Sequence, residues 1–242
     1  MELKSTEALR VFREKGVEWL RHANTVRTVC TFFRSGRLLA RGVIHEAGLD
    51  QTAQQSDRKD RALGVWYDLF FDASDMHELL NQRNIYGPVL LEFDLSLLEQ
   101  DWLPFVWVTK TNPIHWDVDT PSNERWFTSI EELEAGYDPR DPGHHIVLRN
   151  VAGTVRLKPY LRTIIVDYTQ RFPYGSAQTN YSKMAVASFL AAAKEGKVGA
   201  SSIKLKYRDH SATACQCTAQ YQSPNMRLAV VREFFVDENS PI

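Results

Sequence analysis

Four polar residues in the first part of the chain could together hold an anionic ligand. His22, Asn24 and Thr25 lie where one run of helically spaced apolar residues ends and the next begins. Asn24 or Thr25 could equally be the N-cap of the second helix, a role that leaves His22 unexplained. Arg41 follows two leucines and precedes a glycine, so its guanidinium could reach a phosphate or carboxylate through two hydrogen bonds, or be an ordinary surface arginine.

Two further groups could bind a metal ion. Asp72, Asp75 and His77 follow an aromatic apolar run and could be metal ligands or an acid/base group, but two acids and a histidine do not define a site, and a surface turn after a strand is the favoured interpretation. Cys215 and Cys217 cannot bind zinc alone, and no His/Cys pair near them in the sequence completes four ligands. The sequence therefore predicts no metal site.

Candidates for a proton-transferring group lie between residues 131 and 145. Glutamates at 131, 132 and 134 indicate first a solvated helix face and only second a source of a catalytic carboxylate. His144 and His145 begin a predicted strand, whose alternation would turn one ring inward and the other outward. Neither pattern decides which residue would act.

Basic residues recur along the predicted strand at 202–208. Lys204, Lys206 and Arg208 alternate along it and therefore share one face. With Tyr207 between them, they could follow the phosphate backbone of a nucleic acid. An edge strand that lysines protect against further pairing is an equally good interpretation.

The composition argues against several classes of protein. The 242 residues carry 29 Lys and Arg against 30 Asp and Glu, so the net charge of −1 gives no global attraction to nucleic acid. Three cysteines are too few for a disulfide framework, and no stretch approaches the ~18 apolar residues of a membrane span, so we expect a cytoplasmic protein without a membrane partner. The motifs GxxxxGK[ST], GxGxxG, GxSxG and HExxH are absent, which argues against P-loop, Rossmann and α/β-hydrolase chemistry.

The elements that must position these residues follow from periodicity and punctuation. We expect two short helices within 5–21, separated at Gly16, and a helix over 25–36 that ends at Gly36. The polar stretch 44–64 is predicted to be a long functional loop, and the turn at 84–88 could face a ligand or simply precede a strand. Strands are expected at 65–72, 86–93, 105–110, 144–150, 163–167 and 202–208, and helices at 94–100, 127–137 and 182–196. This mixture lacks a regular βαβ rhythm and favours an α+β fold.

The block at 21–42, RHANTVRTVCTFFRSGRLLARG, resembles the opening of the DarT-type ADP-ribosyltransferases. In that family a histidine/threonine segment with a nearby asparagine precedes a helix, and a glycine and a leucine-leucine-x-arginine turn follow it. The polar loop with Asp57-Arg58-Lys59, the run WYDLFFD, the strand GPVLLEF and the later HHIVLRNVAGTVRLKPYLRTIIVD are also similar. The resemblance covers about residues 17–168, and 169–242 have no counterpart.

The resemblance implies a compact α+β ADP-ribosyltransferase fold that holds NAD+ and transfers ADP-ribose to a nucleic acid. Residues 1–168 would form the NAD-binding core, on which 169–242 would pack as an extension of the same domain. His22, Asn24 and Thr25 would contact the nicotinamide–ribose end, and Arg41 would pair with the phosphates or polarise the site. The loop 51–61 would fold over the cofactor. The further cofactor contacts expected are Gln54, Asp57 and Tyr67.

One position departs from the family pattern. A catalytic glutamate stands at the start of the strand that HHIVLRN resembles, and here this position falls on His144 or His145. His145 could serve as the base instead, or Glu132 could enter the site from the helix at 131–134. Either would act together with Arg41, because cleavage of the nicotinamide bond passes through an oxocarbenium-like state and needs both orientation and charge stabilisation.

Three function classes follow. The first is an NAD+-dependent ADP-ribosyltransferase that modifies single-stranded DNA or RNA, as a toxin or phage-defence effector with an antitoxin protein as a partner. The second, motivated by the missing glutamate, is a non-catalytic partner subunit of a toxin–antitoxin or defence complex on the same scaffold. The third is a metal-dependent hydrolase using Asp72, Asp75 and His77.

Overall fold

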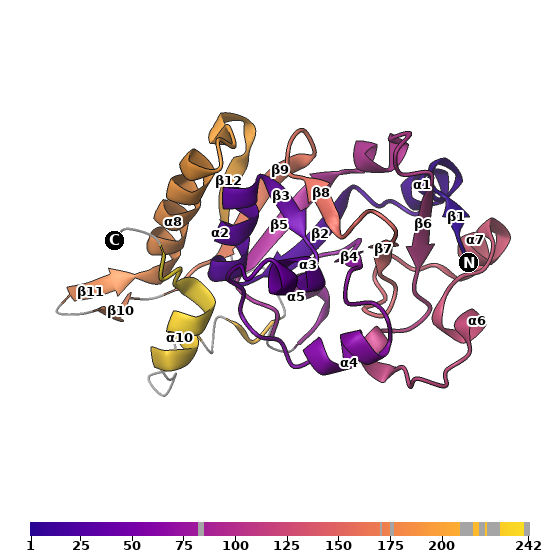
Figure 1. Cartoon of the computed structure of the whole chain (residues 1–242), viewed down its shortest axis with the longest axis horizontal. Helices are drawn as coiled ribbons and strands as arrows, with labels where there is room; N and C mark the ends of the chain where they lie inside the picture. Colours follow the sequence, from indigo (N-terminus) through magenta and orange to yellow (C-terminus); the bar gives the residue numbers. More distant parts are fainter. Residues whose placement is uncertain are drawn as a thin grey trace.

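Two four-stranded β-sheets form the body of the molecule in this computed structural model (Figure 1). The structure describes residues 1–81, 85–169, 171–174, 177–208, 215–217, 221 and 228–239. The first sheet has the order β12-β9-β5-β2. Its strands are β2 (Trp19–Asn24), β5 (Val89–Asp94), β9 (Leu161–Asp167) and β12 (Lys204–Arg208). β12 runs parallel to β9, whereas the other pairs are antiparallel.

The second sheet is antiparallel throughout, in the order β1-β6-β7-β4. Its strands are β1 (Leu3–Lys4), β4 (Leu69–Phe71), β6 (Phe105–Val108) and β7 (Ile146–Leu148). The two sheets meet where Arg21 of β2 and Asp72, directly after β4, exchange two backbone hydrogen bonds of 2.8 Å. Two small sheets pair β3 (Arg37–Leu39) with β8 (Thr154–Arg156), and β10 (Arg171–Tyr174) with β11 (Ala177–Asn180).

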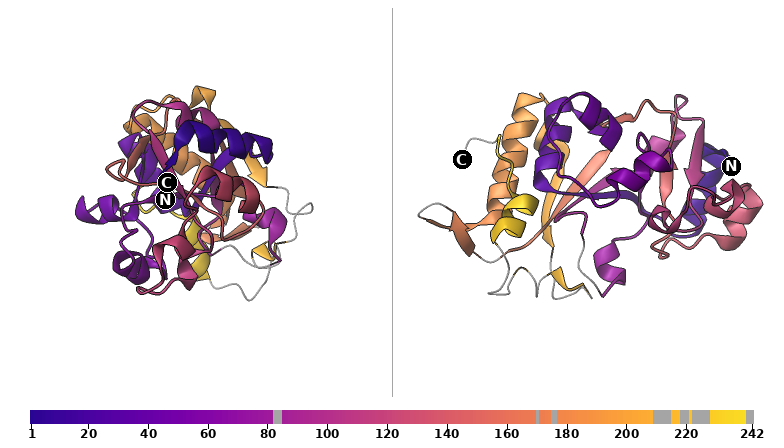
Figure 2. Two further views of the ribbon diagram at one scale, coloured as in Figure 1. Left: turned by 90° about the vertical axis from the view of Figure 1, so that its right-hand side faces the viewer. Right: turned by 60° about the horizontal axis from the view of Figure 1, so that its bottom comes forward.

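Helices surround the sheets without alternating regularly with strands, so the α+β prediction is confirmed. The α-helices are α1 (Ser5–Glu14), α2 (Val26–Ser35), α3 (Arg41–Glu46), α4 (Asp57–Ala62), α5 (Met76–Leu79), α6 (Ser122–Arg125), α7 (Ile130–Gly136), α8 (Tyr181–Glu195) and α10 (Leu228–Phe235). Short 3-10 helices are η1 (Leu95–Glu99), η2 (Pro113–His115) and η3 (Ala200–Ser202). The β10–β11 hairpin projects from one end of the long axis, and α1, α6 and α7 gather at the other (Figures 1 and 2).

Helix α2 is the buried centre of the helical layer. Its N-cap is Thr25, whose hydroxyl accepts from the Thr28 amide, and it ends at Gly36 in the left-handed conformation. It packs against α8, with the rings of Phe33 and Phe189 6.2 Å apart. Gly196 after α8 lies so close to the Phe33 carbonyl that a Cβ there would be only 2.0 Å from its oxygen. The close approach of the two helices therefore requires a glycine at this position.

Two sequence-based expectations about elements are wrong. Residues 19–24 form strand β2 and not a second helix, because Gly16 ends the helical run with φ +79° and β5 pairs with the following residues along their whole length. The polar stretch 44–64 is not one long loop, since it contains the end of α3 and all of α4. The aromatic strand is also shorter than expected, because a turn precedes β4.

No helix within the described residues combines the length and the apolar character that crossing a membrane requires.

The Thr25 cap also holds the segment before α4. Its hydroxyl lies 2.7 Å from the Thr52 hydroxyl in a fully buried setting. We expect Thr25→Ala to lower the free energy of unfolding by about 1–2 kcal/mol, because both the cap and this bond are lost. Thr25→Ser keeps the hydroxyl and should lose clearly less. Urea unfolding of both variants checks this, and equal losses would contradict the capping argument.

Candidate functional site

A cavity opens where the two sheets meet. The space outside the protein atoms, open solvent at the mouth included, amounts to about 970 Å³. Polar and aromatic side chains from both sheets, α2, α3 and the segment around α4 line it: His22, Asn24, Phe32, Arg41, Gln54, Asp60, Trp66, Asp72, Tyr86 and His145. A second cavity, of about 1620 Å³ including open space, shares Asp72, Tyr86 and His145 with the first. The shared residues form the wall between two chambers.

His22 presents a neutral imidazole to the first cavity. Its Nδ1–H donates to the carbonyl oxygen of Phe70 at 2.9 Å, and the Asn24 amide lies 3.4 Å from Nε2. The ring packs between Phe32 and Phe71, with centroids 5.9 and 6.1 Å away. Burial lowers the pKa of His22 below 6.5, outweighing the Phe70 carbonyl and other groups that favour the charged form. Nε2 is therefore an acceptor at neutral pH.

Arg41 lies at the start of α3 with one donor to spare. Its Nε and Nη2 donate to the two carboxylate oxygens of Asp57, at 2.5 and 2.8 Å, and Nη2 also donates to the Thr52 carbonyl at 3.0 Å. Nη1 is buried and has no hydrogen-bond partner among the described residues. Because a buried charged donor without a partner costs free energy, this atom is suited to an anionic ligand. Trp66 lies beside the guanidinium, 5.8 Å from Cζ to the ring centroid.

His145 and Asp72 form a hydrogen-bonded pair on the shared wall. Phe71 pairs with Ile146 in the antiparallel register of β4 and β7, so the next residues along each strand also face one another. Nδ1 of His145 donates to Oδ1 of Asp72 at 2.7 Å. This tautomer leaves Nε2 of His145 free to accept a proton, with the carboxylate ready to stabilise the resulting imidazolium.

Tyr86 reaches the same wall because Gly87 allows the chain to pass close to β2. Gly87 has φ +136°, and a Cβ there would lie 2.3 Å from the carbonyl carbon of Asn24. Burial raises the pKa of Tyr86, and the carboxylates of Asp72 and Asp60 add to this. The predicted ligand-facing turn is thus partly described: Tyr86 lines the cavity, and residue 84 lies outside the described residues.

Of the nine residues predicted to act in catalysis or cofactor binding, five line the first cavity and four do not. His22, Asn24, Arg41, Gln54 and His145 all line the first cavity. Four others do not belong to its lining: Thr25, Asp57, Tyr67 and Glu132.

These four residues have other roles. Thr25 is buried beneath the cavity wall as the cap of α2, and Asp57 orients Arg41. The Tyr67 hydroxyl donates to Glu46 on an exposed surface. Glu132 accepts from Lys110 and from the Thr128 amide and hydroxyl, which lowers its pKa to about 2. The geometry therefore leaves His145, and not Glu132, at the cavity.

Arg208 corrects the expectation of a basic strand face. It is buried, where Nε donates to Asp167 at 2.8 Å and Nη1 donates to Asp75. Lys204 and Lys206 are exposed, and β12 is an edge strand of its sheet. Arg208 differs from the two lysines because it lies at the end of the strand, where Asp75, the N-cap of α5, and Asp167 enclose its guanidinium.

The three residues of the hypothetical metal site all line the second cavity, but each side chain has partners of its own. Asp72 pairs with His145, whereas Asp75 caps α5 and pairs with Arg208. His77 instead approaches Cys215 and Cys217, which the sequence spacing alone could not pair with any histidine.

Sequence reasoning missed three wall residues. Trp66 and Asp60 were not singled out, and Asp72 was considered as a metal ligand or an acid/base group but not as the partner of His145. Burial raises the pKa of Asp60, so this carboxyl is less acidic than usual. The tryptophan beside Arg41 and Arg61, 4.3 Å from the Arg61 Cζ to the ring centroid, had no local signal in the sequence.

Comparisons with known proteins show a distant structural similarity. No family model matches the chain, and no curated protein does either. Among solved structures, the chain is similar to the DarT protein of Thermus sp. 2.9 in complex with NAD+, at 14% sequence identity and a TM-score of 0.45. This match covers 80% of our chain and 96% of the other.

The depressed pKa of His22 has a measurable consequence. Above pH 6.5 the ring is neutral in the folded and unfolded chain alike, so it contributes no pH dependence. As the pH falls below 6.5, His22 becomes protonated in the unfolded chain but stays neutral in the folded chain. His22 therefore lowers the free energy of unfolding as the pH falls. Proton–nitrogen NMR of the ring should show an Nδ1–H tautomer that persists below pH 6.5. Half-protonation at or above pH 6.5 would refute the buried neutral assignment.

Proposed function

We propose that this protein is an NAD+-dependent ADP-ribosyltransferase that modifies a nucleic acid. The observation that carries the proposal is the Arg41 side chain in the cavity wall. Its Nε and Nη2 already donate to Asp57 and Thr52, whereas its Nη1 has no hydrogen-bond partner among the described residues. A guanidinium fixed on two sides is preorganised to bind a pyrophosphate oxygen with the third. The family resemblance of residues 17–168 supplies the identity of the ligand as NAD+.

The His22, Asn24 and Phe32 side chains of the same cavity suit the nicotinamide end of NAD+. The Asn24 side-chain amide and the neutral His22 offer hydrogen-bonding groups to a carboxamide, and Phe32 offers an apolar contact. Asp72 lines the same cavity and can stabilise the positive charge that develops on the ribose as the nicotinamide bond lengthens. The wall thus combines orientation with charge stabilisation.

The paired His145 and Asp72 are assigned the role of the base. They line both cavities. NAD+ bound in the first cavity and the nucleobase to be modified, bound in the second, would therefore meet at this wall. The ribose C1–nitrogen bond to nicotinamide breaks, nicotinamide leaves as a neutral molecule, and C1 bonds to a nitrogen or oxygen of the acceptor. The acceptor proton passes to Nε2 of His145, and Asp72 balances the charge.

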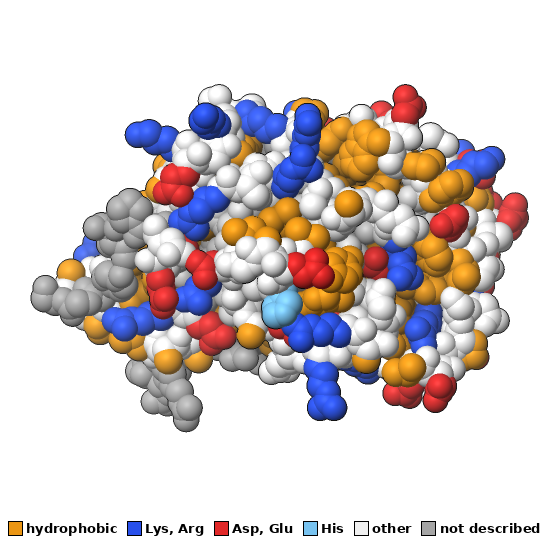
Figure 3. Space-filling model, in the orientation of Figure 1, with side chains coloured by type: hydrophobic (Ala, Val, Ile, Leu, Met, Phe, Trp, Pro, Cys, Tyr) orange, Lys and Arg blue, Asp and Glu red, His pale blue; other side chains and the backbone are white. Residues whose placement is uncertain are grey.

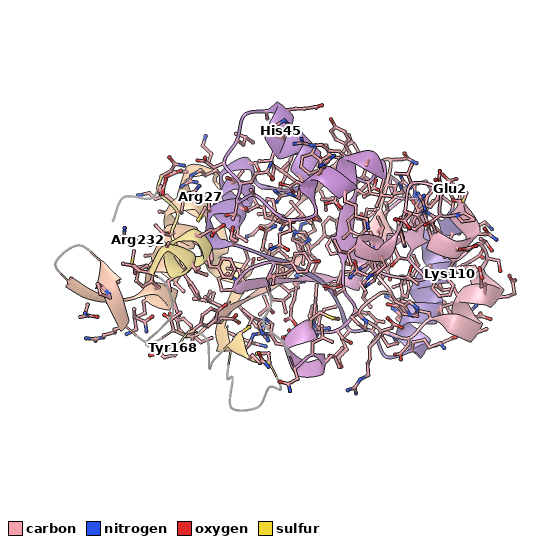
Figure 4. All side chains as sticks on the ribbon, turned by 90° about the horizontal axis from the view of Figure 1, so that it is seen from below. Glu2, Arg27, His45, Lys110, Tyr168 and Arg232 are labelled. Carbon is pink, nitrogen blue, oxygen red and sulfur yellow. The ribbon has the colours of Figure 1, made fainter. Side chains whose placement is uncertain are left out.

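A nucleic-acid acceptor would be guided by local contacts and not by a global field. Positive and negative side chains are interspersed over the face in Figure 3, in keeping with the net charge of −1. Lys110, labelled in Figure 4, lines the second cavity, and Lys204 and Lys206 are exposed on β12. Tyr207 lies between these two lysines in sequence, with its ring 5.9 Å from that of Tyr168. We propose these groups as contacts to a single strand, and a toxin or defence effector with an antitoxin partner as the setting.

The direct test is transfer from NAD+ to single-stranded DNA and RNA oligonucleotides. We expect a mass gain of one ADP-ribose on one of them, detected by mass spectrometry. Arg41→Ala should lower the rate about 100-fold or more, because a preorganised phosphate contact is lost. The control is Arg37→Ala, which removes an exposed arginine of β3 and should leave the rate unchanged.

Calorimetry with NAD+ separates the two main readings of this fold. Binding without transfer to DNA, RNA or a protein acceptor would favour the non-catalytic partner subunit. Absence of both binding and transfer would reject the proposal.

The His145–Asp72 pair gives a second test. Asp72→Asn preserves shape but turns the histidine toward the wrong tautomer, so we expect the transfer rate to fall by roughly 10²–10⁴ while NAD+ still binds. The transfer rate of His145→Ala should fall by a similar factor, and the double variant should transfer no more slowly than either single variant. Additive losses would show that the two residues do not act as a unit.

A further inference from the structure

A cluster of two thiols and one imidazole lies apart from the wall that carries Arg41. His77 of α5 and Cys217 are buried, and Cys215 is partly buried. The three candidate donor atoms all lie within 4.8 Å of one another, and Nδ1 of His77 is 3.2 Å from Sγ of Cys215. The histidine comes from a position 138 residues away in the sequence. Such a convergence in the interior calls for a chemical explanation.

The donor set and its spacing match a tetrahedral zinc ion. Zn–S bonds of about 2.3 Å and Zn–N bonds of about 2.0 Å at tetrahedral angles separate the donors by about 3.5–3.8 Å. The Nδ1–Sγ distance of 3.2 Å lies just below that range and no pair of donors exceeds 4.8 Å, so small side-chain movements bring all three onto one ion. Two thiolates with one imidazole are soft ligands, which favours zinc over calcium, magnesium or manganese.

The far side of the His77 ring has the surroundings of a metal-bound histidine. Asp167 of β9 lies 3.8 Å from Nε2, on the nitrogen that would not bind the ion. This distance is too long for a hydrogen bond, but a carboxylate on this side of the ring favours the tautomer with its proton on Nε2, which leaves Nδ1 for the metal. Asp167 is itself held by Arg208 at 2.8 Å and by the Tyr221 hydroxyl at 3.3 Å. The orientation of the proposed ligand is therefore supported from a strand of the main sheet.

We infer that His77, Cys215 and Cys217 form a structural zinc site that anchors the C-terminal part of the chain to α5. Three protein donors leave the fourth tetrahedral position to a further donor. The role is structural because the cluster is largely buried and neither cysteine lines the cavity of Arg41. His77 does line the second cavity, together with Asp75 and Met76. The ion would thus fix one wall of that cavity while taking no part in the reaction.

The test measures metal in the full-length protein, carrying no histidine tag and purified under reducing conditions without chelator. We expect about one zinc per chain by elemental analysis, and loss of nearly all of it in His77→Ala and in the double variant Cys215→Ser/Cys217→Ser. Cys30→Ala is the matched control, because it removes a buried thiol of α2 outside the cluster and should retain the zinc.

A measurement on the wild type keeps the test decisive if the variants unfold. Titration with an organomercurial should release zinc to a chromophoric chelator in step with the modification of two thiols. Substitution by Co2+ should give the absorption of four-coordinate cobalt with thiolate ligands. Less than about a tenth of a zinc per chain after incubation with equimolar zinc, or a Cys215–Cys217 disulfide under these conditions, would overturn the inference. These readouts are independent of ADP-ribose transfer, so either proposal can fail alone.

Discussion

The reciprocal backbone hydrogen bonds between Arg21 and Asp72 are the constraint on which the candidate site depends. They join the edge strand of one sheet to the end of a strand in the other. The Arg21 side chain reinforces the junction, since it donates to Glu92 and to the Ala73 carbonyl in a mostly buried setting. Because His22 follows Arg21, and His145 faces Asp72 across β4 and β7, this junction sets the spacing of the cavity walls.

The wall of the first cavity that carries Arg41 is positioned by the short segment around Thr52. Thr52 donates its amide to the Thr28 hydroxyl, shares a hydroxyl bond with Thr25, and accepts from Arg41 through its carbonyl. The cap of α2 and the orientation of the guanidinium therefore depend on the same residue. Groups that are held before a ligand arrives lose little freedom when it binds.

The C-terminal part of the chain belongs to this framework. β12 extends the first sheet beside β9, and α8 and α10 pack against α2. Arg208 lies between Asp75 and Asp167, so it connects α5 at the second cavity to the sheet. A buried arginine with two carboxylates favours one arrangement of these elements, because any other would leave charges unpaired.

Local sequence signals determined α2 with its Thr25 cap and Gly36 stop, the strand β12 and the long helix α8, because each depends on neighbours within a few positions. Residue type and position also singled out Arg41, His22, Asn24 and His145 as candidate site residues, and the family resemblance added Gln54. Only the tertiary structure decided that residues 19–24 are a strand, because pairing with β5 outweighs their near-helical apolar spacing. The pairing of His145 with Asp72, 73 positions apart, and of His77 with two distant cysteines likewise depends on how strands and segments meet in space. Contacts between residues this far apart cannot be predicted from their spacing in the sequence, whereas a helix cap involves residues within about four positions of one another.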